Sequence, residues 1–145
     1  MRPPEVIVFI FLFYAACVDV RTFRIDPVVT AVTALTGAVF AVTERLSDPA
    51  GIALSLLPGA ILFLFALISR GGFGPGDGLT LMVTGLFVDV QTVLVTVAAG
   101  VAFSACFAGG YLVFVHFGMQ RRLKGKTFPF LPFVLAGFAL SLIWS

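Results

Sequence analysis

Residues 50–68 read AGIALSLLPGAILFLFALI, an apolar run that contains no charged residue. A helix of about 20 apolar residues crosses the roughly 30 Å hydrocarbon core of a bilayer, so this run predicts a transmembrane helix. The whole chain of 145 residues is 60% hydrophobic and 11% charged, whereas soluble domains are about 45–50% apolar and about 25% charged. The composition therefore excludes a soluble domain, a disordered tail and a secreted disulfide scaffold.

Polar interruptions divide the chain into six apolar segments, at about residues 6–18, 28–42, 50–68, 79–88, 92–117 and 128–144. The first is marginal unless it extends to Pro3, and the fourth is too short to cross a bilayer alone. We predict an all-α membrane protein, a polytopic bundle of six transmembrane helices that forms one domain over residues 1–145. Small residues let membrane helices approach closely, and we expect packing roles for Gly59, Ala60, Gly85, Ala98, Ala99, Gly100, Gly109 and Gly110.

Basic residues are divided unequally between the two ends of such a bundle. Arg2 and Arg45 lie on one side, and the loops of the other side carry Arg21, Arg24, Arg70, Arg121, Arg122, Lys124 and Lys126. The positive-inside rule then places the second side in the cytoplasm and both termini outside, in the plasma membrane. The net charge of +2 gives no reason to expect nucleic-acid binding.

The chain has few residues that can perform chemistry. The single His116 excludes an HExxH metallopeptidase, and no serine lies in a GxSxG elbow. The glycine-rich residues 71–78 lack the Gly-Lys-Ser/Thr of a P-loop, and Cys17 and Cys106 lack metal or redox spacing. We therefore expect no metal and no cofactor, and the carboxylates remain as candidates.

Two of these carboxylates lie at junctions between helix and loop on the predicted cytoplasmic side. Asp19 ends the first apolar segment and Asp77 precedes the fourth. Ionisable groups at membrane depth are costly and usually functional. If the two meet, one carboxylate can activate a water while the other, protonated, polarises a peptide carbonyl. The spacing alone equally permits Asp77 to cap a helix and Asp19 to lie beside Arg21.

Three glycines around Asp77 favour the catalytic interpretation. Gly74, Gly76 and Gly78 permit backbone dihedral angles that other residues avoid, and they would let a substrate backbone approach.

The same residues carry a resemblance to a known family. Gly74-Pro75-Gly76-Asp77 resembles the GxGD motif of intramembrane aspartyl proteases. Asp19-Val20-Arg21-Thr22-Phe23-Arg24-Ile25 resembles the D-x-R-x-x-x-I segment that ends the first helix of type IV prepilin peptidases. Residues 128–133, FPFLPF, resemble the closing proline-aromatic segment of that family.

The resemblance implies an endopeptidase of a bacterial or archaeal membrane that removes the leader of type IV prepilins or preflagellins at the cytoplasmic face. Asp19 and Asp77 would be the catalytic pair, with Gly74, Gly76 and Gly78 positioning Asp77. We expect Arg21, Arg24 and Asp26 to lie around the pair. The expected partners are the prepilin-like or preflagellin substrate and the lipid bilayer, and a homo-oligomer remains open.

The chain departs from the family pattern at three points. Leu79 replaces the lysine common two residues after the second aspartate, and Ile25-Asp26-Pro27 replaces Ile-Pro-Asn. The N-terminal cysteine-containing domain of larger bacterial relatives is also missing, so we expect peptidase activity without N-methylation.

Two other functions fit the same acids. One is a small proton-coupled transporter or channel in which Asp19 and Asp77 relay protons, and the other is an inactive membrane scaffold. Both acids lie on one predicted side and the outer half has no matching polar relay, which disfavours the transporter.

Overall fold

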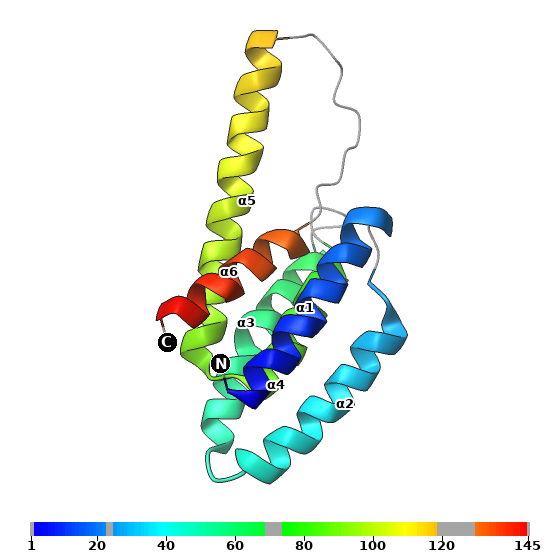
Figure 1. Ribbon diagram of the computed structural model, residues 1–145, viewed down its shortest axis with the longest axis vertical. Coiled ribbons are helices and arrows are strands. Elements are labelled where there is room, and N and C mark those ends of the chain that lie inside the picture. The colour runs from blue at the N-terminus through cyan, green and yellow to red at the C-terminus, as the bar shows by residue number, and fades with distance from the viewer. Residues whose placement is uncertain (1, 23–24, 69–73, 119–129, 145) are drawn as a thin grey trace.

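The computed structural model describes residues 2–22, 25–68, 74–118 and 130–144. These residues form six α-helices and no strand (Figure 1): α1 Pro3–Thr22, α2 Pro27–Glu44, α3 Pro49–Ile68, α4 Pro75–Phe87, α5 Val90–Gly118 and α6 Leu131–Trp144. The all-helical prediction is confirmed. The first four helices each begin at a proline, which suits this position because the N–H that proline lacks would have no intrahelical partner there.

Four of these helices are long and apolar enough to cross a membrane. They are α1, α2, α3 and the part of α5 from Val90 to Tyr111. The other two, α4 with 13 residues and α6 with 14, are only about 20 Å long, less than the roughly 30 Å of bilayer hydrocarbon. The prediction of six spanning helices is therefore supported for four.

Helix α4 is the most enclosed part of the bundle and contacts α1, α2, α3 and α5. This enclosure explains how so short a helix is shielded from lipid. Its buried residues come from several of its faces: Gly78, Thr80, Leu81, Val83, Thr84, Gly85 and Phe87. They join a core that α1 and α6 supply with Val8, Phe11, Leu12, Val134 and Phe138.

Glycines bring α3 and α4 into backbone contact. A Cβ atom at Gly59 of α3 would lie 2.5 Å from the amide nitrogen of Met82, and one at Gly85 of α4 would overlap the carbonyl oxygen of Ser55. The predicted packing role is confirmed for these two glycines. It is wrong for Gly109 and Gly110 as far as the described residues go, because a Cβ at either position meets none of them within 4 Å.

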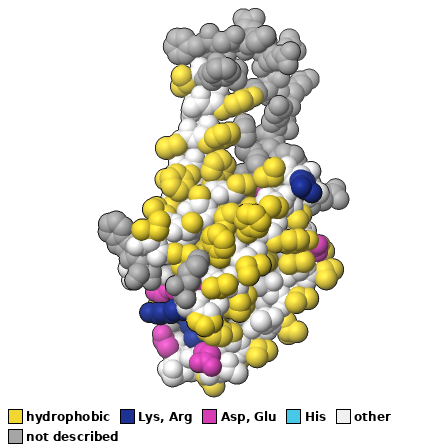
Figure 2. Space-filling view, viewed as in Figure 1, with side chains coloured by type: hydrophobic (Ala, Val, Ile, Leu, Met, Phe, Trp, Pro, Cys, Tyr) yellow, Lys and Arg dark blue, Asp and Glu magenta, His cyan; other side chains and the backbone are white. Residues whose placement is uncertain are grey.

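Apolar side chains cover the outer surface of the bundle. Figure 2 shows them spread over the face in view, with most of its charged side chains near the lower end. Large apolar residues are exposed on several helices, including Ile10, Leu35, Ile68, Phe107 and Ile143. Such a surface is suited to lipid rather than water.

Helix direction brings three helix ends together. Helix α1 ends, and α4 and α6 begin, at the same end of the bundle, which is uppermost in Figure 1. Residues far apart in the sequence therefore meet there.

Candidate active site

Asp19 lies inside α1. The sequence had led us to expect it at the end of this helix. The helix continues to Thr22, whose hydroxyl donates to the carbonyl of Val18 at 2.9 Å, and Arg21 adds a positive charge to the last turn. A basic residue there is stabilised by the negative end of the helix dipole. Asp19 is buried, with 8% of its surface exposed.

The buried carboxylate of Asp19 has a partner at the start of α6. Its Oδ2 accepts a hydrogen bond from the backbone amide of Leu131 at 3.2 Å. The first N–H groups of a helix have no intrahelical acceptor, and Phe130, the residue before α6, has no side-chain acceptor to offer. Asp19 thus acts as an N-terminal cap for a helix far along the chain.

Asp77 lies in the first turn of α4, which begins at Pro75, earlier than the predicted start at residue 79. The pKa of Asp77 is raised to about 7, first by burial of the carboxyl group and second by the negative charge of Asp19. The amide of Gly74, which donates a hydrogen bond to the carboxylate, opposes this rise. An acid three residues after the N-cap that bonds back to the N-cap amide is half of a capping box.

An electrostatic interaction links the two predicted acids. The negative charge of Asp19 contributes, after burial, to the raised pKa of Asp77, so the two carboxyl groups lie within electrostatic range of each other. Each also lies at a helix N-terminus, Asp19 at that of α6 and Asp77 at that of α4. The partial positive charge at these helix N-termini offsets part of the cost of burying the two carboxylates, but burial and the charge of Asp19 still raise the pKa of Asp77.

The glycines near Asp77 do not use glycine-specific backbone angles, and that expectation was wrong. None of Gly74, Gly76 and Gly78 has a positive φ. Gly74 is the N-cap of α4, with φ −73° and ψ 132°. Gly78 packs on the backbone of α3, where a Cβ would lie 2.5 Å from the amide nitrogen of Phe63. Position 78 therefore requires glycine because a side chain there would collide with α3, and not because the backbone needs flexibility.

Asp26, Arg21 and Arg24 were also expected to lie around Asp19 and Asp77. Asp26 is the N-cap of α2, where its Oδ1 accepts from the amides of Val28 at 2.9 Å and Val29 at 3.3 Å, and its Oδ2 accepts from the Tyr14 hydroxyl at 3.1 Å. The Val29 amide, then Tyr14 and Val28, lower the pKa of Asp26. Arg21 is exposed near the end of α1, and Arg24 lies outside the described residues.

Sequence reasoning gave no role to three residues near the pair. The first is Leu131, whose amide donates to Asp19. The second is Ile25, which packs against Gly76, next to Asp77. Thr80 follows Asp77 at the i+3 spacing that places both on one helix face, and it is fully buried. Its hydroxyl has no hydrogen-bond partner among the described residues. Its spacing of three residues from Asp77 is the feature of the sequence that could have identified Thr80.

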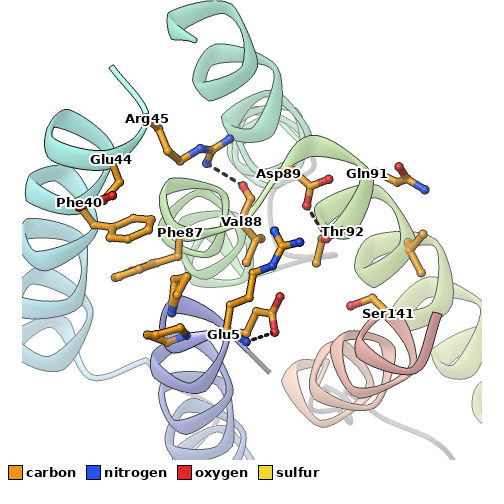
Figure 3. A pocket seen from close by; sticks show the side chains of 14 residues that line it. Glu5, Phe40, Glu44, Arg45, Phe87, Val88, Asp89, Gln91, Thr92 and Ser141 are labelled. Carbon is orange, nitrogen blue, oxygen red and sulfur yellow. Dashed lines mark hydrogen bonds between the residues drawn. The ribbon is translucent and has the colours of Figure 1, made fainter. Parts of the chain in front are cut away.

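A second polar region lies at the other end of the bundle. A cavity of about 830 Å³ is lined by the helix ends there, including Glu5, Glu44, Arg45, Asp89 and Ser141. In Figure 3, Arg45 extends toward the end of α4, where its guanidinium donates to the carbonyls of Val88 at 2.8 Å and Gly85 at 3.1 Å. These are carbonyls at the C-terminal end of a helix, so Arg45 caps α4.

Comparison with known proteins agrees with this geometry. A family model described as the type IV leader peptidase family matches residues 6–144, which include both aspartates and all six helices in large part. No curated protein and no solved structure gives a significant match. With its apolar helices, the chain is a multi-pass membrane protein and a leader peptidase-like protease. It belongs to the type IV leader peptidase family, as the resemblance of its motifs implied.

Proposed function

We propose that this protein is an aspartyl endopeptidase that removes the leader peptide of type IV prepilin-like or preflagellin substrates at the cytoplasmic membrane face. The observation that supports this most strongly is the interaction of Asp19 with Asp77, which adds to burial in raising the pKa of Asp77 to about 7. Carboxyl groups that interact in this way share a proton near neutral pH, as hydrolysis by an activated water requires. Family membership supports the leader-peptide substrate.

The surroundings of the two acids favour different roles for them. Burial disfavours the negative charge of Asp19, but the amide of Leu131 donates to its carboxylate and offsets part of this cost, so we assign Asp19 the role of general base. Asp77 retains its proton up to a pH of about 7 and can donate a hydrogen bond to the scissile carbonyl.

The reaction then proceeds without a covalent intermediate. Asp19 takes a proton from a water, whose oxygen attacks the carbonyl carbon, while Asp77 protonates the carbonyl oxygen. In the second step Asp77 recovers this proton and Asp19 gives its own to the leaving nitrogen. The C–N bond breaks, and both acids return to their starting states.

The charge distribution supports a cytoplasmic position for the site. Arg21 lies at the same end of the bundle as Asp19 and Asp77, whereas Arg2 and Arg45 lie at the opposite end. Basic residues accumulate on the cytoplasmic side of membrane proteins. A substrate would present its scissile bond there and leave its apolar segment against the lipid-exposed helices.

Co-expression with a type IV prepilin tests the proposal. The wild type is expected to shorten the prepilin by its leader, as seen by gel mobility and by the mass of the new N-terminus. Asp19→Asn and Asp77→Asn should leave it unprocessed at equal expression. Normal processing by either variant would refute the paired mechanism. Proton flux in liposomes that disappears in the same variants, without proteolysis, would instead support a transporter.

A further inference from the structure

The two aspartates need a contact that holds them together, because their negative charges repel when both are ionised. Burial and this repulsion act in the same direction on Asp77. Apolar packing between the segments that carry Asp19 and Asp77 can supply such a contact. Ile25 is a described side chain that contacts both segments.

Ile25 contacts the segment that carries Asp77 at Gly76. A Cβ atom built on Gly76 would overlap Cδ1 of Ile25 and would lie 2.9 Å from its Cγ1 and 3.3 Å from its Cβ. The isoleucine side chain therefore occupies the space that a larger residue at position 76 would fill. Because the backbone of Gly76 has no positive φ, this contact is the structural reason for glycine at that position.

The same isoleucine contacts the segment that carries Asp19. Ile25 packs on a small apolar cluster formed by Ala15 and Ala16 of α1 and Leu131 of α6. Ala15 and Ala16 lie one turn before Asp19, and Leu131 provides the amide that donates to its carboxylate. One half-buried side chain thus joins the unit of Asp19 and Leu131 to the residue before Asp77.

We propose that Ile25 is a positioning residue for the proposed catalytic pair, packed on Gly76 so that the first turn of α4 is held against Asp19 and Leu131. This inference rests on the proposed function. Ile25 touches neither the peptide bond nor the water, and it acts through the separation of the two carboxyl groups. A misplacement of about 1 Å in such a pair costs up to about a hundredfold in rate.

A double-mutant cycle of Gly76→Ala and Ile25→Ala tests the contact between these two residues. Gly76→Ala should lower kcat for leader cleavage about tenfold or more at nearly constant KM, because the new Cβ displaces Ile25. Ile25→Ala should lower kcat about three- to tenfold by removing the packing. In the double variant the methyl group added at position 76 enters the space vacated by Ile25, so kcat should be no lower than in Ile25→Ala alone. Gly110→Ala, which meets nothing within 4 Å, controls for the general effect of adding a methyl group.

A second measurement follows the pair without relying on cleavage. The pH dependence of carbodiimide labelling at Asp77, read by mass spectrometry, reports the protonation of this carboxyl group in the full-length protein. Gly76→Ala should lower the midpoint from about 7, because Asp19 moves away, and the double variant should match Ile25→Ala.

The two measurements separate the possible failures. If the losses in kcat multiply in the double variant, or if labelling at Asp77 is the same in all four proteins, Ile25 does not position the pair. If the wild type cleaves no prepilin, the proposed function fails, and the labelling experiment still decides the role of Ile25.

Discussion

The carboxylate of Asp19 accepts a hydrogen bond at 3.2 Å from the backbone amide of Leu131, 112 residues further along the chain. The bond is buried and joins the C-terminal half of α1 to the first residue of α6. Hydrogen bonds to a charged acceptor contribute more to stability than neutral ones, roughly 1.5–3 kcal/mol. It therefore both fixes α6 and favours the negative charge that a general base needs.

Removing this amide should impair catalysis more than removing the Leu131 side chain. Proline is tolerated at the first position of a helix, so Leu131→Pro deletes the donor and keeps α6, whereas Leu131→Ala keeps the donor. Both variants should lower the unfolding temperature, because Leu131 is fully buried. We expect kcat to be about tenfold lower in Leu131→Pro than in Leu131→Ala. Equal kcat values would show that the amide does not assist Asp19.

The raised pKa of Asp77 predicts how stability depends on pH. Between pH values of about 4 and 7 the folded protein retains a proton on Asp77 that the unfolded chain, with a carboxyl pKa of 3.8, has already lost. The folded state then binds more protons, so the free energy of unfolding falls as pH rises, by up to about 1.4 kcal/mol per pH unit. Thermal unfolding in detergent from pH 4.5 to 7 should show this fall in the wild type and a flatter profile in Asp77→Asn. Identical slopes would contradict the assignment.

Helix contact between α3 and α4 depends on the absence of a side chain at Gly85. A Cβ there would overlap the carbonyl oxygen of Ser55 and lie 2.8 Å from its carbonyl carbon, and both atoms are backbone. Gly85→Ala should therefore reduce the free energy of unfolding by about 2 kcal/mol or more. Gly110→Ala, in open space on α5, should be neutral or stabilising by up to about 1 kcal/mol. Similar effects of the two changes in denaturant titrations would argue against close packing of α3 on α4.

Asp26 is expected to stabilise α2 without taking part in cleavage. Its carboxylate accepts hydrogen bonds from the amides of Val28 and Val29 and from the hydroxyl of Tyr14. Asp26→Ala should lower the unfolding temperature, and Asp26→Asn should retain most of the cap because the asparagine Oδ1 still accepts from the amides of Val28 and Val29. Cleavage by Asp26→Asn should stay within about twofold of the wild type. A large loss of kcat with unchanged stability would place Asp26 in the chemistry.

Much of the fold could be predicted from hydropathy, but helix boundaries could not. The apolar runs marked all six helices, since each run must be buried in protein or lipid. Their ends depend on local features, such as a side-chain hydrogen bond or a proline, that hydropathy does not report. Thr22 extends α1 past the charged Asp19 through its bond to Val18, and Pro75 starts α4 before its apolar run begins.

The candidate pair could be predicted because charge is so rare in this chain, but its surroundings could not. Asp19 and Asp77 stood out as acids next to apolar runs on one predicted side. The donor to Asp19 is a backbone amide, which every residue except proline has, so no residue type marks Leu131. The contact of Ile25 with Gly76 likewise depends on tertiary packing.

The central claim, that Asp19 and Asp77 together hydrolyse a leader peptide bond, is tested most directly with purified protein and a synthetic peptide spanning a prepilin leader junction. The measurement is kcat at pH 6.5 for the wild type, Asp19→Asn and Asp77→Asn, with Asp26→Asn as the matched acid control. We predict that each of the first two substitutions lowers kcat by about 10²–10⁴-fold while Asp26→Asn cleaves at nearly the wild-type rate. Cleavage by Asp19→Asn or Asp77→Asn at more than about a tenth of the wild-type rate would contradict the account.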